Sequence, residues 1–83
     1  MNIIKYPLTT EKSIRLMESE NKLTFIVDLK ASKDDIKNEV EKIFKVKVTG
    51  VSTTILPGAK KKAYVTLSLE NPAIDIATQL GLM

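Results

Sequence analysis

The sequence predicts an α+β fold, a small two-layer or three-layer sandwich in which an antiparallel sheet of three or four strands packs with helices. Residues 22–29 (KLTFIVDL) and 62–69 alternate apolar and polar side chains, as strands buried on one face do. Residues 32–44 instead repeat apolar side chains at the spacing of a helix. With 83 residues the chain has room for one domain, so we expect residues 1–83 to fold as a unit.

The N-terminal part predicts an extended segment, a helix and a strand. Pro7 favours an extended backbone over residues 1–8. Thr9 or Thr10 can cap a following helix, which has a narrow apolar stripe and a plausible stop at Asn21. In the strand that follows, the side chains expected to point toward the core are Leu23, Phe25, Val27 and Leu29.

The helix predicted to begin after residue 32 has the clearest pattern in the chain. Ser32 is a good N-cap, and Asp35 stands three residues later, where a carboxylate can complete a capping box. Its apolar stripe consists of Ile36, Val40, Ile43 and Phe44. Such a helix after a strand can cross back over one face of the sheet.

Residues 46–56 and 62–69 predict a β-hairpin around the turn signal Pro57-Gly58. The alternation in the first strand changes phase near Gly50, and a bulge there would restore the register. In the second strand we expect the core face to hold Ala63, Val65, Leu67 and Leu69, and the outward face to hold Lys62, Tyr64, Thr66 and Ser68.

A short helix is predicted at the end of the sequence. Asn71 is expected as its N-cap, Pro72 as its first residue and Gly81 as its stop.

The composition excludes several kinds of chemistry. The chain has no His and no Cys, so a histidine general base, a cysteine nucleophile and a zinc site built on these side chains are impossible. Its glycines are isolated, and no apolar run approaches the about 20 residues of a membrane-spanning helix. We therefore expect no enzyme, no cofactor, no metal and no direct membrane insertion. We also expect the free protein to be a monomer.

Positive charge is concentrated in one segment. The net charge is only +3, but residues 42–69 contain lysines and no acidic residue. Lys45 and Lys47 open the first hairpin strand, and Lys60, Lys61 and Lys62 lie at the tip. This asymmetry indicates a polyanionic partner, because ammonium groups meet a phosphate backbone without demanding precise geometry. The simpler interpretation is a solvated, charged tip that protects a sheet edge.

The outward face of the second hairpin strand adds other groups that suit RNA. Tyr64 can stack a base, and the Thr66 hydroxyl can bond to sugar or phosphate oxygens. By itself, Tyr64 is better explained as a half-buried ring that packs on a neighbouring strand.

The stretch YPLTTEK is a second candidate anion site. Thr9, Thr10 and Lys12 lie at a predicted helix N-terminus, with Lys5 and Arg15 on either side, and helix N-termini bind anions readily. Glu11 opposes that interpretation, because its carboxylate repels phosphate. Spacing alone favours simple capping by threonine.

Several motifs resemble the large-subunit ribosomal protein twenty-three family, which lies at the exit of the nascent-chain tunnel. YPLTTEKS resembles the opening Pro-x-x-Thr/Ser-Glu-Lys of that family, and residues 21–55 resemble its strand–helix–strand body. KKAYVTLS (61–68), with Ile76 eight residues after Ser68, fits its signature pattern. The short turn PGAKKK and the ending AIDIATQLGLM resemble the archaeal type, because the bacterial type has a long basic insertion at this turn.

The resemblance implies a structural protein of the large subunit, located in the cytoplasm within the ribosome. Its implied partners are large-subunit ribosomal RNA, neighbouring ribosomal proteins, signal recognition particle and the protein-conducting channel. Glu11 matches the exposed docking acid of the family, and the missing long loop puts contact deep inside the tunnel in doubt. The residues expected to contact RNA are Lys5, Thr9, Thr10, Lys12, Arg15, Lys45, Lys47, Lys60, Lys61, Lys62, Tyr64 and Thr66.

Two other functions remain open on the residues alone. One is a free-standing RNA-binding module, although such modules usually expose more aromatic side chains than this chain contains. The other is a small acyl phosphate hydrolase on a similar sandwich. That chemistry requires an arginine cradle, and Arg15 is the only arginine.

Overall fold

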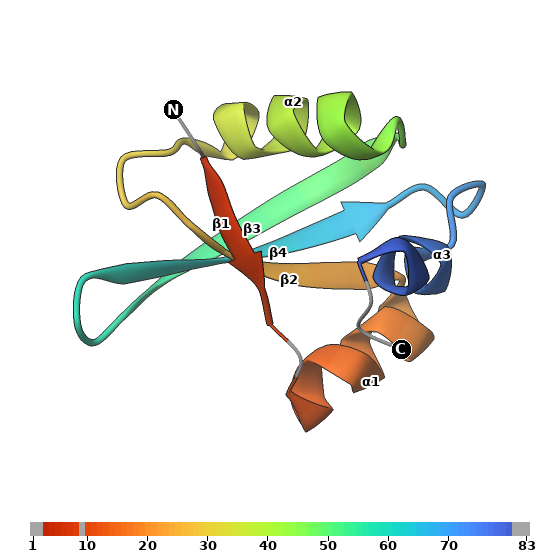
Figure 1. Cartoon of the computed structure of the whole chain (residues 1–83), viewed down its shortest axis with the longest axis horizontal. Helices are drawn as coiled ribbons and strands as arrows, with labels where there is room; N and C mark the ends of the chain where they lie inside the picture. Colours follow the sequence, from red (N-terminus) through yellow and green to blue (C-terminus); the bar gives the residue numbers. More distant parts are fainter. Residues whose placement is uncertain (1–2, 9, 81–83) are drawn as a thin grey trace.

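The computed structural model describes residues 3–8 and 10–80 and has four strands and three helices in that part of the chain (Figure 1). The sheet is antiparallel throughout, with the strand order β1-β2-β4-β3. This arrangement confirms the predicted α+β class. In chain order, the elements are β1 (Ile4–Pro7), α1 (Glu11–Glu20), β2 (Lys22–Val27), α2 (Lys33–Phe44), β3 (Val48–Leu56), β4 (Lys60–Leu67) and α3 (Ala73–Gln79).

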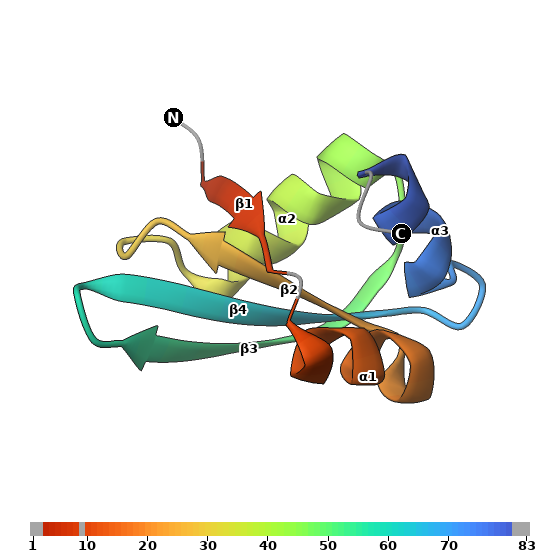
Figure 2. The same ribbon diagram turned by 60° about the horizontal axis from the view of Figure 1, so that its bottom comes forward.

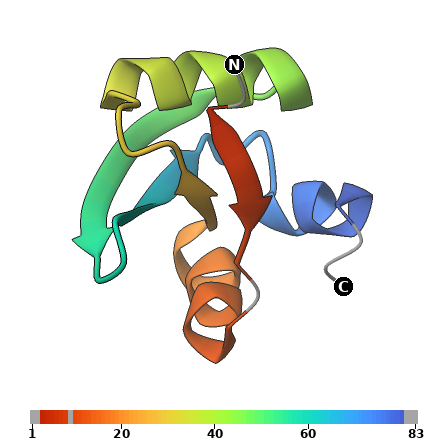
Figure 3. The same cartoon turned by 60° about the vertical axis from the view of Figure 1, so that its left-hand side comes forward.

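The helices lie on different sides of the sheet. α2 crosses one face, and α1 lies on the other side, next to β2, as Figures 1 and 3 show. α3 lies near α1, at the end of the sheet away from the hairpin tip (Figure 2). The outward side of β3 and β4 therefore has no helix lying along it among the described elements.

Most of the core lies between the sheet and the helices α2 and α3, and Met17 of α1 belongs to the same cluster. Phe25 is 1% exposed, and its ring stacks against that of Phe44 with 6.1 Å between centroids. Ile36 and Val40 on α2 are completely buried, as are Ala63 and Val65 on β4. These residues were expected in the core from their spacing, and the structure confirms them there.

Local sequence signals determine where the two longer helices, α1 and α2, begin. The Thr10 hydroxyl accepts the Ser13 backbone N–H at 3.2 Å, and the Ser13 hydroxyl accepts the Thr10 N–H at 2.8 Å. Ser32 and Asp35 form the predicted capping box at the start of α2. Each box satisfies backbone donors that the first helical turn leaves without partners.

The predicted bulge in β3 is present. Val48 pairs with Leu67 and Gly50 with Thr66, so an additional residue of β3 lies between these two pairs. From Val51 onward the strand is in the new phase that the sequence indicated.

Both predicted strands end two residues earlier than expected: β2 is shorter than the predicted 22–29 strand, and β4 keeps the predicted length but begins at Lys60 instead of Lys62. β2 ends at Val27 because Asp28 starts a turn, in which its backbone carbonyl accepts the Ala31 N–H at 3.0 Å. Leu29 is consequently 42% exposed. β4 ends at Leu67, and Leu69 is 90% exposed in the connection to α3. The core positions predicted for these two leucines were wrong, because turns intervene.

The start of α3 also differs from the prediction. Pro72 occupies the N-cap position, and Ala73 is the first helical residue. Asn71 does not cap the helix. Its Oδ1 instead accepts the Lys47 backbone N–H at 2.9 Å, which joins this loop to the start of β3. The expected stop at Gly81 lies outside the described residues. In the parts of the chain that are described, no helix has the length and apolar character needed to span a membrane.

Candidate nucleic-acid interface

The open face of the hairpin is defined by strand alternation. Ala63 and Val65 of β4 point to the core, so Lys62, Tyr64 and Thr66 point to the opposite side. Cross-strand pairing places hydroxyl side chains beside them, because Ser52 pairs with Tyr64 and Thr54 pairs with Lys62. We call these five residues the open face: Ser52, Thr54, Lys62, Tyr64 and Thr66.

Lys62 and Tyr64 form a pair on this face. The Lys62 Nζ lies 5.3 Å from the centroid of the Tyr64 ring, which is within the range of a cation–π contact. Both side chains are half-buried. The Tyr64 ring is therefore half-buried on the sheet, as the packing interpretation predicted. It also has the Lys62 ammonium group beside it, so the face presents a cation next to an aromatic ring.

The positive charge of the hairpin is not neutralised within the described part of the chain. The ion pairs found there are Arg15–Glu11 and Lys22–Glu20, and neither includes a hairpin lysine. Lys60 is exposed and lies on the same side of β4 as Lys62, two residues away. Figure 2 shows the hairpin reaching past the start of α2, so its tip is accessible to a large partner.

Lys61 points the other way. Its Cα partners are Val27 on β2 and Ile55 on β3, on the side of the sheet that α2 covers. Its Nζ donates a hydrogen bond of 2.6 Å to the backbone carbonyl of Ala31. The three consecutive lysines therefore do not form one cluster.

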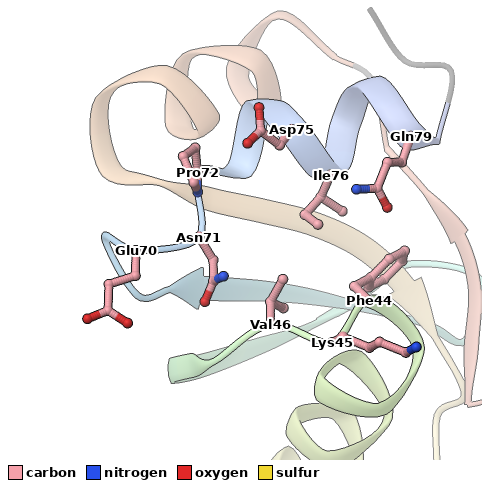
Figure 4. Close-up of a pocket in the computed structure, with 9 residues that line it drawn as sticks. All are labelled: Phe44, Lys45, Val46, Glu70, Asn71, Pro72, Asp75, Ile76 and Gln79. Carbon is pink, nitrogen blue, oxygen red and sulfur yellow. The ribbon is translucent and has the colours of Figure 1, made fainter.

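Lys45 and Lys47 lie far from the tip. Both precede β3, whose nine residues separate them from the turn by roughly 30 Å at the usual rise per residue. Lys45 is the C-cap of α2 and lines a small pocket together with the acidic residues Glu70 and Asp75 (Figure 4). The structure does not bring these two lysines together with the open face.

The residues of the second candidate anion site, at the start of α1, do not come together in one site either. Thr10 uses its hydroxyl in the capping box. The Arg15 guanidinium donates to the Glu11 carboxylate at 2.7 Å, one helical turn away, and both side chains are well exposed. Lys12 is exposed without such a contact among the described residues, and Thr9 lies outside the described part.

Lys5 lies elsewhere, at the irregularity between Ile4 and Tyr6 in β1, and is exposed. It lies on the opposite edge strand from β3, because β2 and β4 lie between them.

Ser52 and Thr54 were not among the residues expected at the site. The phase change at Gly50 could have identified them, because it turns Val51, Thr53 and Ile55 toward the core side and their neighbours outward. Tyr6 was also missed. It is 44% exposed, and its Cα partner Ile26 is in turn the partner of Lys62, so Tyr6 belongs to a row that leads to the open face.

A small α+β domain with an open sheet face, on which Lys60 and Lys62 lie beside an aromatic ring and hydroxyl side chains, has the groups that proteins use to bind nucleic acid. Comparison with known proteins gives the particular family. Residues 2–75 match the family model described as Ribosomal protein L23. The chain belongs to this family of structural proteins of the large ribosomal subunit, which is not a family of enzymes.

Two relatives illustrate the match, and both are named large ribosomal subunit protein uL23. The one from Methanococcus aeolicus is 46% identical over 81 residues, which cover 98% of this chain and 94% of the relative. The one from Trypanosoma brucei brucei is 47% identical over 81 residues, but the chain spans only about half of that relative, 49%. The nearly full-length archaeal match agrees with the archaeal type inferred from the short hairpin turn.

Proposed function

We propose that this chain binds large-subunit ribosomal RNA through the open face and the hairpin tip, and that residues 1–83 act as a single RNA-binding domain. The observation that carries this proposal is the open face itself. Lys60 and Lys62 lie on one side of β4, next to hydroxyl side chains and an aromatic ring, and form no ion pair with a described carboxylate. Family membership supports the choice of ribosomal RNA as the polyanion.

Each group on this surface has a different task in the proposal. The ammonium groups of Lys60 and Lys62 contact phosphates, which supplies affinity and makes binding depend on salt. The hydroxyls of Ser52, Thr54 and Thr66 are spaced along two neighbouring strands, where they can bond to 2′-hydroxyl or phosphate oxygens. Such contacts recognise the shape of a folded RNA more than its sequence.

The remaining predicted residues form outlying contacts. Lys5, Thr10 and Lys12 are on the side of β1 and α1, so they can meet the same RNA only if it extends across the sheet. Thr9 stays a proposed contact on sequence grounds alone. Arg15 can bind a phosphate only if its contact with the Glu11 carboxylate breaks. Lys45 and Lys47 require a second RNA segment, because they lie at the far end of β3.

Salt dependence tests this surface. Replacing Lys60 and Lys62 with Met should flatten the slope of log K against log[salt] for large-subunit RNA by about 1.4–1.8, the value for two lost phosphate contacts. The matched control replaces Lys37 and Lys42 with Met. Those lysines are exposed on α2, away from the open face, and the control removes the same charge. Equal slopes for the two double variants would refute the proposed surface.

We also propose that the chain lies near the tunnel exit and docks signal recognition particle and the protein-conducting channel through Glu11. The Glu11 side chain is 82% exposed and lies in the first turn of α1, on a different element from the open face. Its pairing with Arg15 is a surface contact, worth about 0.3–0.5 kcal/mol, so a partner can replace it at small cost.

The Glu11→Lys variant separates docking from RNA binding. We expect RNA affinity to stay the same or rise slightly, because the added charge is positive, while ribosomes carrying the variant capture less signal recognition particle in a co-sedimentation assay. The Glu18→Lys variant is the control, since Glu18 is an exposed acid on the same helix. A loss of RNA binding in Glu11→Lys alone would show that the two surfaces are not separate.

The hydrolase interpretation gains no support from the structure. Its required arginine, Arg15, is held by Glu11 on the exposed surface of α1. We therefore propose a structural rather than a catalytic role.

A further inference from the structure

We propose that Lys61 is an internal anchor of the hairpin rather than one of its RNA contacts. The residue lies in the middle of the lysine triplet, where the sequence alone gives it the same role as its neighbours. Strand alternation separates it from them, because Lys60 and Lys62 lie on the open side and Lys61 on the side covered by α2. Its ammonium group already has a partner there, the Ala31 carbonyl at 2.6 Å.

The contact joins two segments that the sheet ladder does not connect. Ala31 lies in the turn after β2, with its own N–H donating to the Asp28 carbonyl at 3.0 Å. The next residue, Ser32, caps α2. Lys61 therefore fastens the segment that leads into α2 to the beginning of β4, where Lys60 and Lys62 lie.

Burial makes this hydrogen bond important. Ala31 is only 5% exposed, so its carbonyl has little access to water. A bond from an ammonium group to a carbonyl is stronger than one between neutral groups. Removing the ammonium group leaves a shielded acceptor without a partner, which destabilises a fold more than the loss of an exposed contact.

The same geometry keeps Lys61 away from RNA on the open face. A phosphate near Lys62 lies on the opposite side of the sheet from the Lys61 ammonium group. For Lys61 to reach it, the bond to Ala31 must break and the side chain must pass around the edge of the hairpin. Lys61 is thus a positioning residue, and Lys60 and Lys62 supply the accessible charge.

Chemical acylation of the free protein tests the anchor without RNA. In the parent protein we expect Lys61 to react about tenfold more slowly than Lys60 or Lys62, since its amine must first leave the Ala31 carbonyl. The Lys61→Met variant, which keeps most of the apolar stem, should lower Tm by at least about 4–8 °C, which is the shift for one hydrogen bond of ordinary net strength in a domain of this size, because the lost bond is charge-assisted and its acceptor is shielded. Lys61→Arg retains a donor and should recover at least half of that loss, whereas Lys60→Met should leave Tm almost unchanged.

The RNA arm of the test rests on the proposed function. With large-subunit RNA transcribed in vitro, Lys61→Met should leave the slope of log K against log[salt] unchanged, and Lys62→Met should flatten it by about 0.7–0.9. A flattened slope for Lys61→Met, or acylation of Lys61 as fast as that of Lys60, would overturn the anchor. If neither variant changes the slope while acylation and melting behave as expected, the anchor stands and the proposed RNA surface falls.

Discussion

Asn21 shows how much of this small fold depends on a single side chain. Its backbone has φ 55° and ψ 40°, the left-handed conformation that ends α1. The Nδ2 group lies 3.1–3.2 Å from the carbonyl oxygens of Leu67, Ser68 and Asn71, and the Oδ1 accepts the Ala73 N–H at 2.6 Å. One amide therefore joins the end of α1, the end of β4 and the first residue of α3.

Two substitutions at Asn21 separate its side chain from its backbone. Asn21→Gly keeps easy access to the left-handed conformation and loses the hydrogen bonds, so we expect the free energy of unfolding to fall by about 2–3 kcal/mol. Asn21→Ala should cost about 1 kcal/mol more, because alanine is strained at this backbone conformation. Urea denaturation measures both, and a glycine variant as stable as the parent would show that the amide contacts contribute nothing.

For single residues, the sequence predicted features set by neighbouring residues and missed contacts with residues far along the chain. It predicted that Asn21 ends a helix, because left-handed Asn is a common helix stop. It could not predict partners that lie 46 to 52 residues further along the chain. In the same way, alternation predicted the outward direction of Tyr64, but the carbonyl that Lys61 binds is 30 residues away.

Among the elements, α2 has an optimised start and a strained end. Ser32 and Asp35 satisfy its first turn. At its other end, the C-cap Lys45 has φ 56° and ψ 45°, a conformation that glycine adopts at lower cost than any other residue. The starts of α1 and α2 and the bulge in β3 were predicted because their signals lie within a few residues. The ends of β2 and β4 were not, because the turns that end them involve contacts outside the strand pattern.

Replacing Lys45 with glycine should therefore stabilise the protein. We expect an increase of about 0.5–1 kcal/mol in the free energy of unfolding for Lys45→Gly and none for Lys45→Ala. Both variants remove the same charge, so a comparison by urea denaturation isolates the backbone effect. Equal stability of the two variants would mean that the left-handed conformation carries no strain at this position.

At the scale of the whole molecule, the accessible lysines of the hairpin and most of the hydrophobic core lie on different sides of the sheet. Most of the core lies on the α2 side of the sheet, with Met17 of α1 also in the cluster, and the accessible lysines of the hairpin lie on the open face and at the tip. The sequence predicted the fold class because each strand and helix has its own pattern. It did not give the strand order, because the pairing of β2 with β4 joins residues about forty positions apart, and no local signal specifies that neighbour.

This separation leads to a prediction for the assembled particle. If the open face and the tip lie on RNA, the lysines that touch it should be those of the hairpin and not those of α2. Lys60 and Lys62 are the expected contacts, and the exposed α2 residues Lys37 and Lys42 are the internal comparison.

The most direct test is lysine-to-RNA crosslinking in purified large ribosomal subunits, with adducts mapped on both the protein and the RNA. We predict adducts from Lys60 and Lys62 to large-subunit RNA and few or none from Lys37 and Lys42. Adducts confined to the α2 lysines, or hairpin lysines that crosslink only to protein, would contradict the account.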